Sequence, residues 1–239
     1  MRLKFAPQAG LTLMEVLIAV SLLSLLSVGM LIAMRVGLSA MAKANARLID
    51  DRRVAGAQRI LEQEIAGFMP VKALCGGADT QAPKSSILFF QGEPQSMRFV
   101  STYSVQQAWR GLPQILEFTV LPREDGKGVR LVVNEHVYSG PISAGAFCMG
   151  PARFVPIQTG SGSFVLADNL AFCRFAYLAP PAPPLPAARW VPNRILPRWP
   201  LGVRVEMAPF QDDAARLRPV TVTQGIRITR SMEIEYVDQ

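Results

Sequence analysis

The chain has 239 residues, half of them hydrophobic (50%) and 18% charged, and its formal net charge is +7. This length leaves room for one domain of ordinary size in addition to an extended helix. The basic residues are scattered and form no dense patch with interleaved aromatic residues, so the composition argues against nucleic acid as a partner.

The first predicted element is an apolar segment from Leu11 to Met34, in which Glu15 is the one charged residue. A short leader that carries Arg2 and Lys4 precedes it. The segment is long enough to cross the hydrocarbon core of a bilayer. Because a carboxylate costs about 3 kcal/mol at the centre of a membrane helix, its presence there indicates a function.

Three interpretations of this segment compete. A cleavable signal peptide has a short apolar stretch followed by a small-residue cleavage site, whereas here Gly10 precedes a long stretch. A plain signal anchor explains the length of the segment, but neither Gly10 nor Glu15. The third interpretation is a prepilin, in which a glycine closes the leader and a glutamate follows at a fixed distance.

The run from Gly10 to Ala19, with Glu15 as the fifth residue after Gly10, resembles the signature of type IV pilins and type II secretion pseudopilins. The resemblance implies that a prepilin peptidase cuts between Gly10 and Leu11 and methylates the new amino group of Leu11. The family usually has phenylalanine at this first mature position, so Leu11 is a departure. Residues 1–10 are then the leader.

The same resemblance implies a role for Glu15 in assembly. In the family, the amino-terminal ammonium of a neighbouring subunit is thought to neutralise this glutamate, which sets the axial register of the subunits. Such a pair in a low dielectric fixes geometry even where its net stabilisation is small. The alternative is that Glu15 lies close enough to the membrane interface to remain hydrated.

The helix is predicted to continue beyond the membrane, because no proline occurs between Arg35 and Phe68. Its apolar residues recur at steps of three and four, as one buried helical face requires. These residues are Val54, Ala57, Leu61, Ile65 and Phe68. Gly67 and Pro70 predict its end, so residues 11–69 are expected to be helical, 11–34 within the membrane and 35–69 amphipathic.

Residues 70–239 alternate between short strand-like runs and turns rich in glycine and proline, which predicts an antiparallel β-sheet. The expected strands are 96–105, 115–121, 129–133, 164–167, 170–177, 202–207 and 225–237. The run 170–177 is nearly all apolar and is therefore expected to be buried on both faces. The predicted class is α+β, with a long N-terminal hydrophobic helix packed on an antiparallel β-sheet domain.

The proline-rich segment 180–186 allows two interpretations, a ligand for a proline-binding module or a stiff surface loop, and the loop is favoured outside the cytoplasm. The nearby Trp190 and Trp199 either fold against the domain or contact a partner.

Two C-terminal stretches resemble the minor pseudopilin J family of type II secretion. They are Phe172–Tyr177, similar to an aromatic strand of that family, and Leu196–Glu206, similar to its leucine-proline step into a following strand. The resemblance implies a noncatalytic tip or initiation subunit of the pseudopilus. A minor pilin of a type IV pilus carries the same N-terminal signal and remains an alternative, as does a signal-anchored periplasmic binding module.

The implied partners are other minor pseudopilins, the prepilin peptidase and the inner-membrane secretion platform. The implied location is the inner membrane before assembly, with a single membrane pass and the C-terminal domain in the periplasm.

No catalytic or metal site is expected, and no cofactor. His136 is the one histidine and no zinc-ligand spacing surrounds it. Ser161 lies among glycines, without the strand–turn–helix context of a hydrolase nucleophile. The pairs Asp50-Asp51 and Asp212-Asp213 do not match a calcium loop.

The three cysteines Cys75, Cys148 and Cys173 fall in the part predicted to lie outside the cytoplasm, where disulfides persist. Three single bridges are possible, and each leaves one thiol over. Cys75–Cys148 is the favoured pair, and the alternative is that all three are reduced, with Cys173 a buried strand residue.

Overall fold

The computed structural model describes residues 12–76, 85–105, 109–149, 153–182, 186–193, 198–211 and 218–226. The chain divides into two compact units, Met1–Ile49 and Asp50–Gln239. A long N-terminal helix is followed by antiparallel β-sheet, which confirms the predicted α+β class.

Helix α1 (Leu13–Ala66) contributes residues to both units. It is rich in leucine, alanine and methionine, which are strong helix formers. It ends three residues before the predicted boundary, because Phe68 and Met69 form strand β1 instead. The turn at Gly67 lies tight against strand β5, where a Cβ would come within 2.6 Å of the Tyr103 ring and 2.7 Å of Ser101 Oγ. This close approach explains the glycine at the end of the helix.

In the second unit, the final turns of α1 carry the buried face that the sequence periodicity predicts. Val54, Ala57, Leu61 and Ile65 are each at most 2% exposed. They belong to one hydrophobic cluster with residues of the sheet. Phe68, predicted to extend this face, packs half-buried against the same cluster from β1.

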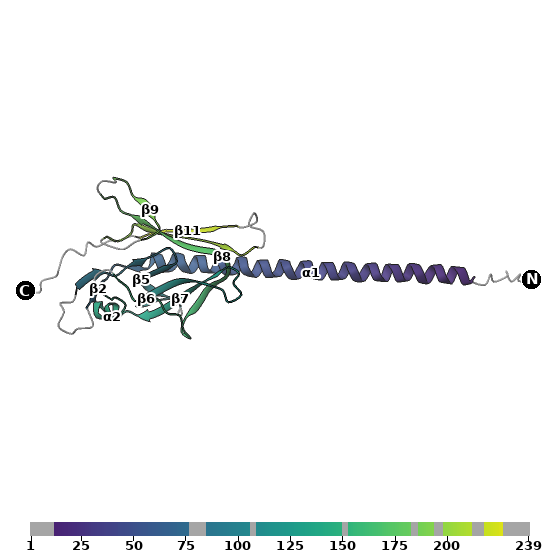
Figure 1. The fold of residues 1–239 in the computed structure, drawn as a ribbon, viewed down its shortest axis with the longest axis horizontal. Helices are drawn as coiled ribbons and strands as arrows, with labels where there is room; N and C mark the ends of the chain where they lie inside the picture. Colours follow the sequence, from purple (N-terminus) through teal and green to yellow (C-terminus); the bar gives the residue numbers. More distant parts are fainter. Residues whose placement is uncertain are drawn as a thin grey trace, which may run out of the picture. The chain divides into compact units, whose positions relative to one another are not determined.

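The main sheet is antiparallel throughout, with the strand order β1-β5-β6-β7-β8-β10-β11. Its strands are β1 (Phe68–Met69), β5 (Ser96–Ser104), β6 (Trp109–Pro122), β7 (Val129–Val137), β8 (Phe164–Ala179), β10 (Gly202–Pro209) and β11 (Val220–Gly225). The short strands β4 (Gln91–Gly92) and β9 (Arg189–Val191) pair with β5 and β8 respectively. Strands from β5 to β11 contribute to the cluster around the helical segment 50–66, and Figure 1 shows β8 and β11 on one side of that segment and β5–β7 on the other.

A second hydrophobic cluster covers the opposite face of β5 and β6. It contains Val100 and Ile115 from these strands, together with residues of a two-stranded sheet, β2 (Lys72–Cys75) and β3 (Ser85–Leu88), and of the short helix α2 (Pro141–Gly145). The middle of the main sheet is therefore buried on both faces.

Strand β8 differs from the prediction in two ways. Residues 164–167 and 170–177 form one strand, because Asn169 adopts a left-handed conformation (φ 55°) and lets the strand pass through the turn-forming pair Asp168-Asn169. The run 170–177 is also not buried on both faces. Cys173, Phe175 and Tyr177 lie in the core. Arg174, which lies between Cys173 and Phe175 in the strand, is exposed.

Strand β11 was not predicted, and the expected strand 225–237 lies almost wholly outside the described residues. The two tryptophans near the proline-rich segment differ in their surroundings. Trp199 packs against the core, with its ring 5.4 Å from that of Phe68. Trp190 lies on β9, half-buried beneath the guanidinium group of Arg204.

Candidate functional site

The first candidate site is the N-terminal end of α1. Gly10 and Leu11 lie outside the described residues, so cleavage and methylation at these positions stay predictions. Glu15 lies in the first helical turn, and its backbone N–H donates to the carbonyl (3.0 Å) and hydroxyl oxygen (3.4 Å) of Thr12. Thr12 therefore caps the helix, and a carboxylate in the first turn suits the positive end of the helix dipole.

The part of α1 that belongs to the first unit exposes apolar side chains on all sides. Twenty large hydrophobic residues from Leu13 to Ile49 are exposed, with exposed fractions from 48% at Val16 to 80% at Leu13. A helix that is apolar all round requires a bilayer or other protein around it. By length and composition, α1 qualifies as a candidate membrane span.

The hydroxyl groups in this segment are satisfied within the helix. Ser21, Ser24, Ser27 and Ser39 each donate to a carbonyl oxygen three or four residues earlier, at 2.8–2.9 Å. Because an unsatisfied polar group is costly in hydrocarbon, this internal bonding lets the serines sit in an apolar environment. Glu15 is then the one ionisable side chain between Leu13 and Met34.

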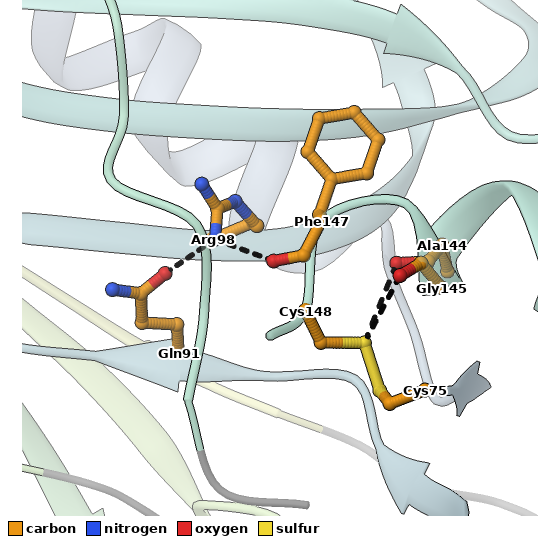
Figure 2. The surroundings of a disulfide bond; sticks show 7 residues. All are labelled: Cys75, Gln91, Arg98, Ala144, Gly145, Phe147 and Cys148. Carbon is orange, nitrogen blue, oxygen red and sulfur yellow. Dashed lines mark hydrogen bonds between the residues drawn. A yellow bond between two sulfur atoms is a disulfide. The ribbon is translucent and has the colours of Figure 1, made fainter. Parts of the chain in front are cut away.

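The second candidate site is the disulfide-linked surface on the far side of β5 and β6. Cys75, on β2, and Cys148, just after α2, are joined by a disulfide, which is the pair favoured from the sequence. Figure 2 shows this bond beside the end of α2, where Cys148 Sγ lies 3.4 Å from the carbonyl oxygen of Gly145. The third cysteine, Cys173, is a buried thiol in the main core, and burial raises its pKa to about 12. Cys173 is therefore an unreactive core residue.

Arg98 is fully buried beneath the disulfide-linked segment. Its guanidinium group donates to Glu117 Oε1 (2.7 Å), Gln91 Oε1 (2.7 Å) and the backbone carbonyl of Val155 (2.7 Å). It also lies 5.5 Å from the ring centroids of Phe147 and Phe154, and Figure 2 shows it turned toward Gln91 and the Phe147 carbonyl. Burial lowers the pKa of Arg98, and the opposite charge of Glu117 counteracts this shift.

Glu117 completes this buried network. Its second carboxylate oxygen accepts a hydrogen bond from Asn134 Nδ2 (3.0 Å) and lies 3.2 Å from His136 Nε2. Both charges at the centre of the network are thus compensated, and Arg98 holds the backbone carbonyls of Phe147 and Val155 against the sheet. A fully satisfied network of this kind orders a surface rather than activating a nucleophile.

The other residues considered for catalysis or metal binding are His136, Ser161 and the two aspartate pairs. His136 lies at the exposed end of this network, Ser161 lies in a turn, and Asp212 and Asp213 fall outside the described residues. Within the described ranges, no group of three or more histidine, cysteine, aspartate or glutamate residues is placed to hold a metal ion.

The periodicity of the sequence did not reveal one unusual group, Glu64. It lies on the packed part of α1, is 3% exposed, and its Oε2 atom has no hydrogen-bond partner. Burial raises its pKa from 4.5 to about 7, a hydrogen bond with Ser101 opposes the shift, and the charge of Glu135 adds to it. Glu64 therefore carries a proton at mildly acidic pH. The sequence feature that could have indicated its burial is its position beside Leu61 and Ile65 on the predicted core face.

Comparison with known families identifies the N-terminal segment. The model of the prokaryotic N-terminal methylation motif matches residues 6–31, a range that contains Gly10, Leu11 and Glu15. The match supports a type IV pilin-like protein that is processed by a prepilin peptidase and assembles with other pilins. A comparison with curated proteins gave no significant match.

Proposed function

We propose that the chain is a noncatalytic minor pseudopilin, a tip or initiation subunit of a type II secretion pseudopilus that drives protein export across the outer membrane. The observation that carries the proposal is the methylation motif at residues 6–31, which coincides with a helix whose apolar side chains are exposed on all sides. Such a helix can reside in the inner membrane before assembly and in a helical bundle afterwards.

In the proposed mechanism, cleavage after Gly10 frees the amino group of Leu11, which is then methylated. Loss of Arg2 and Lys4 with the leader lowers the formal net charge from +7 to +5 (7 − 2). Glu15 then pairs with the amino terminus of a neighbouring subunit and sets the axial register. The β-sheet domain, in the periplasm, contacts other minor pseudopilins.

The C-terminal resemblance to pseudopilin J favours secretion over a pilus. Val203, Val205 and Met207 of β10 pack in the core beside Phe175 and Tyr177 of β8, as paired strands of one sheet. Phe172–Tyr177 is thus a hydrogen-bonded neighbour of Gly202–Glu206, the paired part of the second stretch. The proposal contains no catalytic step.

The experiment that tests this proposal is co-purification of the full chain with each minor pseudopilin of the same cell, after expression with the prepilin peptidase. Stable co-purification with the minor pseudopilins, and loss of secretion on deletion, would support it. Co-purification with minor pilins together with loss of pili would favour the type IV pilus instead. A chain that keeps its leader and binds neither set would indicate the signal-anchored binding module.

A further inference from the structure

The outward face of β8, β10 and β11 is defined by strict alternation along these strands. Val203, Val205 and Met207 of β10 are buried in the core, so Arg204 and Glu206 point away from it. Arg204 is paired with Ala176 on β8 and Thr223 on β11, and Glu206 with Arg174 and Thr221. Both threonines are exposed. These six residues form one continuous surface, named here the arginine face.

Arg204 is held in place by an aromatic ring. Its guanidinium carbon lies 4.1 Å from the centroid of the Trp190 ring, within range of a cation–π interaction. The side chain is therefore ordered before any partner binds, which reduces the entropy lost on binding.

Arg204 lacks a charge partner within the described part of the chain. Its Nε atom is buried without a hydrogen-bond partner, and it takes part in none of the ion pairs of the described residues. The neighbouring Arg174, by contrast, is paired with Glu206 at 2.6 Å. Arg204 thus provides an ordered guanidinium group that forms no ion pair with a carboxylate of the described residues.

The surroundings are strongly basic. In the described residues from 170 to 226, the charged side chains comprise one carboxylate, Glu206, and five arginines, Arg174, Arg189, Arg198, Arg204 and Arg218. Four of these arginines, all except Arg204, are exposed. A partner that fits this region must therefore carry negative charge.

No lysine occurs after Lys127, so arginine supplies every basic side chain of this region. The planar fork of arginine matches a carboxylate or a phosphate in two parallel hydrogen bonds, whereas lysine acts as a point charge. Tryptophan and arginine are also the residues that dominate binding energy in protein–protein interfaces. Because Trp190 and Arg204 form such a pair on this face, the anion proposed here is a carboxylate on a protein segment.

We propose that the arginine face is a docking surface for a partner protein that presents an acidic segment, with Arg204 as the residue that receives its carboxylate. This surface is separate from the N-terminal segment that carries the proposed assembly function. Failure of docking would therefore leave cleavage after Gly10 and co-purification through α1 intact.

The test measures binding of a fluorescent hexaglutamate peptide to the full chain in nonionic detergent by anisotropy. Arg204→Gln should weaken binding about tenfold or more. Arg204→Lys, which keeps the charge and loses the fork, should also weaken it, as should Trp190→Leu, which keeps the charge and loses the stacking. Arg153→Gln is the matched control, because it removes one exposed arginine elsewhere and should change the affinity less than twofold.

A second variant keeps the test valid if Arg204→Gln fails to fold. Thr223→Glu adds a negative charge, the same sign as that of the peptide, on the exposed side of β11. It should abolish binding while the unfolding curve remains that of the wild type. Full affinity in Thr223→Glu and in Arg204→Lys would overturn the proposal. Equal losses in Arg204→Gln and Arg153→Gln would also overturn it, because binding would then follow net charge alone.

Two other occupants are distinguished by the same assay. Tighter binding of inositol hexakisphosphate than of the peptide, lost in Arg204→Gln, would overturn the proposal in favour of a phosphate ligand. Glu233 and Glu235 of the chain itself could also occupy the face. If the wild type fails to bind the peptide and the double variant Glu233→Gln, Glu235→Gln binds it, the occupant belongs to the same chain and the proposal is overturned.

Discussion

The two parts of helix α1 differ in what surrounds their apolar side chains. In the first unit, Leu26 is 72% exposed and Met30 is 76% exposed, whereas in the second unit Leu61 and Ile65 are at most 1% exposed. The second part satisfies its hydrophobic face within its own domain. The first part requires an environment that the chain does not supply, either a bilayer or other subunits.

The largest expected effect separates these two parts directly. Leu61→Ala should lower the free energy of unfolding of the β-sheet domain by about 2–5 kcal/mol, because it leaves a cavity between α1 and the sheet. Leu26→Ala makes the same chemical change in the exposed part and should leave this free energy unchanged. Urea unfolding of the full chain in detergent, followed by tryptophan fluorescence, measures both. Equal effects of the two variants on the free energy of unfolding would contradict the difference between the two parts of α1.

The disulfide is expected to stabilise only the second unit. Cys75 and Cys148 are separated by 73 residues, so loss of the bridge should cost about 4 kcal/mol by chain entropy. Cys75→Ser and Cys148→Ser should each lower the thermal midpoint of the domain and remove its sensitivity to reductant. Cys173→Ala, which leaves the bridge in place, is the control, and a midpoint in Cys173→Ala that no longer responds to reductant would contradict the pairing.

The packed part of α1 should also make stability depend on pH. The pKa of Glu64 is about 7 in the folded state against 4.5 ordinarily, so the folded state binds the proton more tightly than the unfolded state. The free energy of unfolding should therefore fall as pH rises from about 4.5 to about 7, and this contribution should then stay constant. The full loss is about 3 kcal/mol.

Glu64→Gln removes the ionisable group while it keeps the shape of the side chain. The variant should match the wild type near pH 4.5 and exceed it in stability at pH 8. Glu124→Gln, at a side chain that is 93% exposed, is the matched control. If the free energy of unfolding falls between pH 4.5 and 7 as much in Glu64→Gln as in the wild type, another group causes the decline.

The smallest expected effect on stability belongs to Glu15. Glu15→Ala changes a residue of the first unit and should leave both the unfolding curve of the domain and cleavage after Gly10 largely intact. It should impair incorporation with other subunits, which co-purification after cleavage measures. Normal incorporation of the variant would contradict the register role proposed for this carboxylate.

The sequence predicted best what depends on neighbours in the chain. The face of Val54, Ala57, Leu61 and Ile65 follows from helical periodicity alone. Spacing likewise singled out Gly10 and Glu15, and the match of the methylation motif covers both.

The sequence predicted less well what depends on pairing between distant strands. Strand β8 continues through Asp168-Asn169, a pair that normally indicates a turn, because β7 pairs with its first part and β10 with the remainder. A charged residue such as Arg98 is expected at the surface of a strand. It is buried because the backbone carbonyls of Phe147 and Val155, 49 and 57 positions later in the chain, accept its hydrogen bonds. Such partners cannot be inferred from local pattern.

The central claim is that the exposed part of α1 belongs to a prepilin that is cut at its leader and assembled through its new amino terminus. Its most direct test is the intact mass and amino-terminal sequence of the full chain, expressed with and without the prepilin peptidase. The account predicts that the peptidase removes residues 1–10 and leaves N-methylated Leu11 as the first residue. An unchanged amino terminus in the presence of an active peptidase, or cleavage after the apolar segment, would contradict it.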